Sequence, residues 1–156
     1  MSPFIRKLFR GGKRKFLLLI AAAVILAFIW SQSLLSTDLS ADESGWITNH
    51  IINPILRLVG LSVPDGFVRK AAHVTEFAVL GLIVTLLWDC HPIRSFYSGF
   101  TIAFIDETIQ VLVKRGPMIT DVWIDLIGVT IGFFIAVWID RARKRKRKRN
   151  RNSKNE

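Results

Sequence analysis

Ionisable and amide side chains recur inside stretches of this sequence that are otherwise apolar. They fall into three sets: His73 and Glu76; Asp106, Glu107 and Gln110; Asp121 and Asp125. The members of a set are at most four residues apart, so on a helix each set lies on one side. The pattern predicts a polar site to which several helices contribute.

Carboxylates dominate this predicted site. Five carboxylates accompany three basic side chains nearby, a surplus of two negative charges. Neighbouring carboxylates in a poorly solvated place hold a proton or bind a cation, and an imidazole adds a general base or a nitrogen ligand. The residues expected to act in catalysis are His73, Glu76, Asp106, Glu107, Gln110 and Asp125. The alternative is a divalent-cation site with the ligands His73, Glu76, Asp106 and Asp125. The residues expected to contact a substrate are Arg69, Lys70, Arg115 and Asp121.

Four long apolar segments carry these residues: 16–30, 71–88, 96–113 and 122–139. Three of them have 18 residues, and a helix of that length spans roughly 27 Å, close to the ~30 Å hydrocarbon layer of a bilayer. The first is shorter, but uncharged residues extend it to Thr37. The sequence therefore predicts an all-α, polytopic membrane protein with four transmembrane helices.

Two alternatives to this architecture fit the sequence less well. A basic stretch before a short apolar one is also typical of a cleaved signal peptide, but the best cleavage point, at 39–41, lies well past the apolar stretch. A soluble helical bundle needs polar outer faces, whereas AVLGLIVTLLW and GFFIAVWI are apolar all round. Both observations favour uncleaved membrane helices.

The sequence is basic as well as hydrophobic. Its 156 residues carry a net charge of +10, and 16 of the 22 Lys and Arg lie in two tails, 1–15 and 141–156, on either side of a single four-helix domain at 16–140. Because Lys and Arg near membrane spans are retained in the cytoplasm, we expect a multi-pass cell-membrane protein with both termini cytoplasmic. The basic tails attract anionic lipid of the bilayer, and no nucleic-acid partner is expected.

This orientation places the predicted polar site in the outer half of the bilayer, about 4 to 12 Å below the surface by the helical rise. The outer connection at 46–59 is apolar on one broad side, with Asn49, Asn53 and Arg57 at every fourth position. We expect an amphipathic helix that lies in the outer membrane surface. Pro54 should kink it, because proline removes a backbone hydrogen bond.

Three motifs, in order along the chain, resemble the VanZ family of bacterial membrane proteins, which is named for a teicoplanin-resistance protein. They are RKAAHVTEF at 69–77, DETIQ at 106–110, and DVWID at 121–125 with Gly128 and Gly132. The resemblance runs from Trp30 to about Gly132. The family usually has a Gly-Arg pair after the glutamine motif, and here Lys114 precedes Arg115, which takes the place of the family arginine.

The resemblance implies a single VanZ-like domain at 16–140 and a role in the bacterial cell envelope, with changed susceptibility to teicoplanin-type glycopeptides as one expectation. It implies no particular reaction. The residues leave four functions open: an enzyme acting on an outer-leaflet lipid or glycolipid, an accessory protein that binds a lipid or lipoglycopeptide unchanged, an ion-coupled carrier, and a structural charge network. Whether the protein is an enzyme, and whether it uses a divalent cation, are left open.

Overall fold

The computed structural model describes residues 12–34, 45–58, 60–113 and 119–152. Over these ranges the chain is helical and contains no strand. The elements are α2 (Gly12–Leu34), the π-helical η1 (Thr48–Ile52), α4 (Asn53–Arg57), α5 (Asp65–Leu87), α6 (Pro92–Leu112) and α7 (Ile119–Asn152). The predicted all-α class is confirmed for the described part of the chain.

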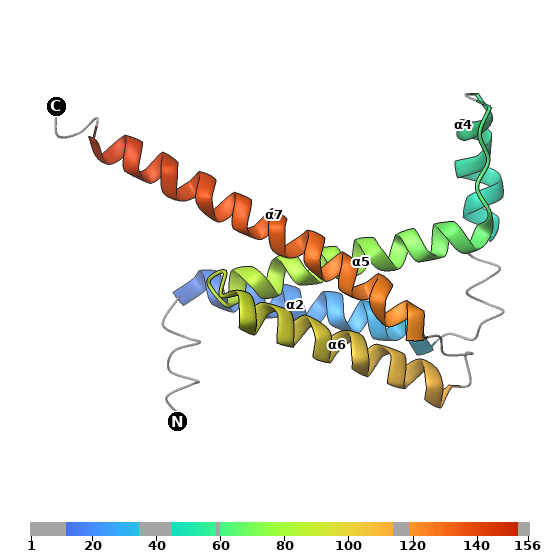
Figure 1. Cartoon of the computed structure of the whole chain (residues 1–156), viewed down its shortest axis with the longest axis horizontal. Coiled ribbons are helices and arrows are strands. Elements are labelled where there is room, and N and C mark those ends of the chain that lie inside the picture. The colour runs from blue at the N-terminus through green and yellow to red at the C-terminus, as the bar shows by residue number, and fades with distance from the viewer. Residues whose placement is uncertain (1–11, 35–44, 59, 114–118, 153–156) are drawn as a thin grey trace.

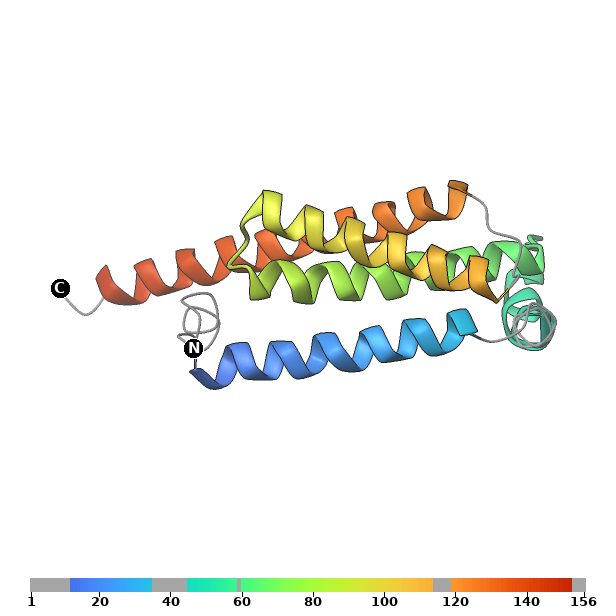
Figure 2. The same ribbon diagram turned by 90° about the horizontal axis from the view of Figure 1, so that it is seen from below.

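The four long helices alternate in direction along the bundle (Figures 1 and 2). The α5–α6 turn lies at the end where α2 begins, and α7 runs past the bundle on this side. The opposite end holds the ends of α2 and α6 and the beginnings of α5 and α7. The three predicted polar sets belong to this second end, so the alternation brings distant parts of the sequence together.

Three helices of the described chain are long and apolar enough to cross a membrane: α2, Gly66–Leu87 of α5, and the portion of α7 from Asp121. α6 has 21 residues but is not among them, because Asp106, Glu107 and Gln110 lower its hydropathy. Of the four predicted spans, three are therefore supported by length and composition. The span at 96–113 stays a prediction.

Small residues bring the backbones of α5 and α7 close together. A Cβ atom added to Gly81 would lie 2.6 Å from the Val129 carbonyl oxygen, and one added to Gly128 would lie 2.5 Å from that of Val74. One added to Gly132 would collide with the Ala78 carbonyl oxygen. Because lipid tails are as apolar as side chains, close backbone packing of this kind is a main source of helix association in membranes.

The turn between α5 and α6 is tight, and an ion pair connects it to α2. Asp89 and Cys90 adopt left-handed backbone conformations, with φ of 53° and 61°, which are uncommon for residues other than glycine. The Lys15 ammonium at the start of α2 lies 2.7 Å from the Asp89 carboxylate. α6 then begins at Pro92, whose fixed φ and missing N–H suit the first turn of a helix.

The connection between α2 and α5 differs from the predicted amphipathic helix, of which Val59 lies outside the described residues. Residues 45–47 are helical and lead into η1, and α4 begins next to Pro54. Asn53, predicted on the solvated face, is buried, and its amide bonds both the N–H and the carbonyl of Val63 at 2.9 and 3.2 Å. An amphipathic helix on the membrane surface is therefore not confirmed.

The close contact of α5 and α7 predicts a large difference between two glycine substitutions. Gly132→Ala should destabilise the protein by about 1–3 kcal/mol, because the added methyl overpacks the interface. Gly66→Ala is the matched control, since nothing lies within 4 Å of a Cβ added there. The measurement is the thermal unfolding midpoint of each purified variant in detergent. Equal midpoints for Gly132→Ala and the parent chain would contradict this packing.

Candidate functional site

Asp106 is a wholly buried carboxylate in α6, with 0% of its surface exposed. The Ser33 hydroxyl of α2 donates to its Oδ1 at 2.6 Å, and the Gln110 amide donates to its Oδ2 at 2.9 Å. Both oxygens of the carboxylate are therefore satisfied by the protein. The hydrogen bond from Ser33 also ties α2 to α6, across 73 residues of sequence.

Ser33 was not predicted as a site residue. It is buried on the same face of α2 as Ile29, four residues earlier, and both have no exposed surface. Ser31, two residues before it, is exposed, and its hydroxyl donates to the Phe28 carbonyl of its own helix at 2.7 Å. Each serine follows an apolar residue by four positions, Ala27 or Ile29, so this spacing does not distinguish the two serines.

Carboxylates from three helices surround Asp106. Asp125 of α7 is 3% exposed and lies within electrostatic reach of Asp106, Glu107, Asp121 and Glu76. We call Glu76, Asp106, Glu107, Asp121 and Asp125 the carboxylate cluster. The sequence prediction that these residues share one end of the bundle agrees with this arrangement.

His73 and Glu76 form a pair at the edge of the cluster. The His73 Nδ1 atom lies 3.9 Å from the Glu76 Oε2 atom, and about a fifth of each side chain is exposed. Glu76 Oε2 itself is buried and accepts no hydrogen bond from the residues that the structure describes. This carboxylate oxygen therefore has unused capacity to accept a hydrogen bond.

The remaining predicted site residues are less closely involved. Arg69 is half-buried and Lys70 is exposed at the start of α5, and within the described ranges neither forms an ion pair with the cluster. Asp121 is half-buried at the start of α7. Arg115 lies outside the described residues.

The predicted divalent-cation site is not found in the geometry. No group of three His, Cys, Asp or Glu side chains in the described parts of the chain is arranged to hold a metal ion. Asp106, one of the four expected ligands, already uses both oxygens as hydrogen-bond acceptors. Among the described residues, the arrangement is that of a hydrogen-bonded carboxylate site.

Comparison with known proteins agrees with these motifs. The family described as VanZ/LLP1 matches residues 14–140, which include α5, α6, most of α2, the first part of α7 and the whole carboxylate cluster. The chain belongs to the VanZ/LLP1 family. The uncharacterized membrane protein YwnJ of Bacillus subtilis (strain 168) is similar to this VanZ/LLP1 protein, with 35% identity over 92 residues.

The alignment with YwnJ covers 58% of this chain and 62% of YwnJ. The VanZ/LLP1 protein described here therefore spans about three fifths of the length of this curated relative. No solved structure matches the chain. Family membership and the three apolar helices together establish a VanZ-like membrane protein. The name of its relative assigns no activity.

The hydrogen bond between Ser33 and Asp106 leads to a prediction about stability. Ser33→Ala should destabilise this VanZ/LLP1 protein by about 1–3 kcal/mol, because it leaves a buried carboxylate oxygen without a donor. Ser31→Ala is the matched control and should have little effect, since its hydroxyl is exposed. Unfolding midpoints in detergent measure both. If the two alanine variants unfold alike, the hydrogen bond does not stabilise the fold.

Proposed function

We propose that the chain crosses the membrane four times, with α6 as the fourth span. The support is that polar and apolar side chains of α6 differ in exposure: Asp106, Glu107 and Gln110 are buried, while Phe96, Phe104 and other apolar side chains are exposed. The acidic side chains are thereby kept from lipid, where each charge would cost at least ~2.5 kcal/mol. Its length of 21 residues is sufficient for a helix that crosses the membrane.

The same proposal places both termini in the cytoplasm. Basic residues concentrate near the start of α2 and in the last turns of α7, and these two helix ends lie on one side of the bundle (Figure 2). The α5–α6 turn lies on that side too, and the carboxylate cluster lies toward the other. Retention of Lys and Arg in the cytoplasm then turns the cluster toward the outer leaflet.

Cys90, the single cysteine of the sequence, tests this topology. It lies in the α5–α6 turn, where burial raises the pKa of its thiol. The thiolate is the reactive form, so labelling should be slow at neutral pH and faster as the pH rises. A membrane-impermeant maleimide should label Cys90 only after cells are permeabilised.

The control for this experiment is Leu61→Cys in a Cys90→Ser background. Leu61 is exposed between α4 and α5, on the proposed outer side, so its cysteine should react in intact cells. Labelling of Cys90 in intact cells, with Leu61→Cys protected, would reverse the orientation. Labelling of both in intact cells would contradict the single membrane crossing by α5 that separates Leu61 from Cys90 in this topology.

We propose that the carboxylate cluster binds the polar headgroup of an amphiphilic envelope lipid or glycolipid from the outer leaflet. The observation that carries this proposal is the set of buried acceptors: Asp125, 3% exposed, beside Glu76, whose Oε2 accepts no hydrogen bond from the described residues. Both oxygens of an ionised carboxylate, and the carbonyl oxygen of a protonated one, accept hydrogen bonds. A complementary headgroup therefore carries donors, such as sugar hydroxyls or an ammonium group.

Acid–base chemistry on the bound headgroup is a second candidate, and the His73–Glu76 pair favours it. Both side chains remain partly exposed, and their reactive atoms are 3.9 Å apart. A general acid or base must reach the proton that it transfers, and this pair lies at the exposed edge of the cluster. Binding without chemistry needs only the buried acceptors.

Carboxylate-to-amide substitutions separate these functions from a structural network. Asp125→Asn and Glu76→Gln keep the size of each side chain and should lower the amount of envelope lipid that copurifies with the protein by about tenfold, since a charge-assisted hydrogen bond contributes roughly 1.5–3 kcal/mol. Lipids extracted from the purified chain are quantified by mass spectrometry. Asp140→Asn is the control, because Asp140 pairs with Lys144 at 2.6 Å at the far end of α7.

The outcomes are distinct. If membrane abundance falls in the two cluster variants and copurified lipid per protein does not, the cluster is structural and the proposal fails. If copurified lipid falls while abundance holds, the cluster is a binding site. A chemically altered lipid that His73→Ala abolishes would favour the enzyme, and a parallel change in teicoplanin susceptibility of the cells would connect the site to the glycopeptide response proposed for this chain.

A further inference from the structure

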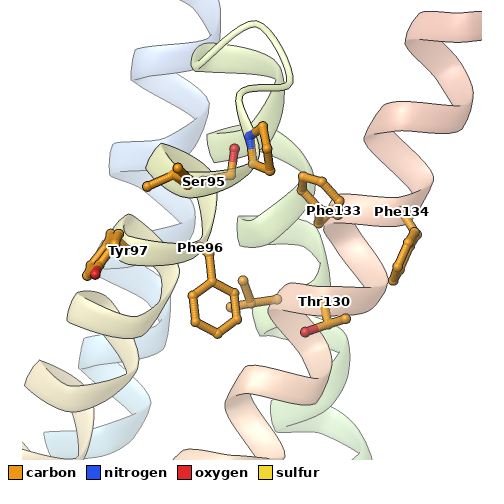
Figure 3. A pocket seen from close by; sticks show the side chains of 9 residues that line it. Ser95, Phe96, Tyr97, Thr130, Phe133 and Phe134 are labelled. Carbon is orange, nitrogen blue, oxygen red and sulfur yellow. The ribbon is translucent and has the colours of Figure 1, made fainter.

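An apolar groove lies between α6 and α7, at the opposite end of the bundle from the carboxylate cluster. Figure 3 shows Phe96 of α6 facing Thr130 and Phe133 of α7 across the opening, with Phe134 at its outer edge. The groove has a volume of about 420 Å³, within the range of pockets that hold small ligands. Phe96, Thr130 and Phe134 are exposed, so the groove opens to the side of the bundle.

The groove results from the way the two helices separate. A Cβ atom on Gly99 would collide with the Val129 side chain, so α6 and α7 touch there. Toward the α5–α6 turn α7 diverges from α6 (Figure 1), and the groove opens between them. At this end the Cys90 thiol reaches the Ala136 carbonyl oxygen of α7 at 3.9 Å. The Gly99–Val129 contact therefore closes the groove toward the middle of the bundle, and the Cys90–Ala136 contact lies at its other end.

An arginine of α7 lies beyond the end of the groove at the α5–α6 turn. Arg94 in the first turn of α6 is exposed, but its guanidinium carbon lies 5.7 Å from the centre of the Trp88 ring, which does not line the groove. Arg141 is exposed on α7, seven residues beyond Phe134. Seven residues are two helical turns, about 10.5 Å along the same face.

We infer that this groove holds one acyl chain of an anionic glycerophospholipid, whose phosphate lies near Arg141. The apolar walls fit the chain, and the Arg141 guanidinium fits the headgroup, since arginine recognises phosphate oxygens with two parallel hydrogen bonds. Lys144, three residues beyond Arg141, is paired with Asp140. The inference concerns the end of the bundle away from the carboxylate cluster and is independent of the function proposed for that cluster.

The two parts of the lipid contribute differently to this binding. An acyl chain gains no hydrophobic free energy by leaving bulk lipid for an apolar groove, because both surroundings are equally apolar. The groove therefore fixes the position of the chain, and Arg141 selects the charge of the headgroup. Each basic residue near an anionic membrane contributes about a fivefold preference.

Native mass spectrometry of the full chain in detergent tests this inference. The chain is titrated with dioleoyl phosphatidylglycerol and, separately, with dioleoyl phosphatidylcholine. We expect one tightly held phosphatidylglycerol. Thr130→Trp should abolish it by filling the groove, and Thr108→Trp is the control, because Thr108 is an exposed threonine of α6 with the same hydroxyl-to-backbone bond of 2.7 Å.

The headgroup is tested with a second pair of variants. Arg141→Gln should reduce the preference for phosphatidylglycerol over phosphatidylcholine about fivefold, whereas Arg147→Gln, six residues further along the exposed end of α7, should leave it unchanged. Equal effects of the two glutamine variants would show diffuse attraction to a basic helix and overturn the inference. Equal binding by Thr130→Trp and Thr108→Trp, or a dimer that Thr130→Trp disrupts, would overturn it as well.

Discussion

A carboxylate buried in a membrane protein must find its hydrogen-bond donors inside the protein, because the hydrocarbon layer supplies none. Asp106 has no exposed surface, and its two oxygens accept from Ser33 and Gln110. Gln110 is one turn away on the same helix, but Ser33 belongs to α2. The need to satisfy one acidic group therefore fixes where the first long helix packs against the third. It also explains how a helix with two adjacent acidic residues can present an apolar outer surface.

The second organising contact is the crossing of α5 and α7. Gly81, Gly128 and Gly132 let the two backbones approach closely. Because the two helices cross at an angle, they can be this close only near the crossing point. On one side of the contact the helices carry carboxylates, and on the other side α7 leaves the bundle. The carboxylate cluster and the apolar groove are in this sense both consequences of where the small residues lie.

Much of this arrangement could be predicted from the sequence. The four apolar segments correspond to the four long helices, with boundaries shifted by up to six residues, except that α7 continues 13 residues past the last segment. The helical spacing of His73 and Glu76, and of Asp121 and Asp125, predicted common faces, and alternating direction predicted a common end. The role of Ser33 could not be predicted, because a serine in an apolar helix bonds equally well to its own backbone, as Ser31 does. Asn53 was assigned to a polar face by its spacing, whereas its amide is occupied by the backbone of Val63, a tertiary contact with no local signal.

The length of α7 has a consequence for the state of its last turns. Its 34 residues make a helix of about 51 Å, and the hydrocarbon layer accommodates only ~30 Å of it. The remainder places Arg141, Arg145 and Arg149 one above the other, and each like-charged pair at this spacing weakens a helix by roughly 0.2–0.5 kcal/mol. The distance over which such repulsion acts is about 10 Å at 0.1 M salt and shortens as salt is added. The helicity of this end therefore depends on ionic strength, while that of the apolar portion does not.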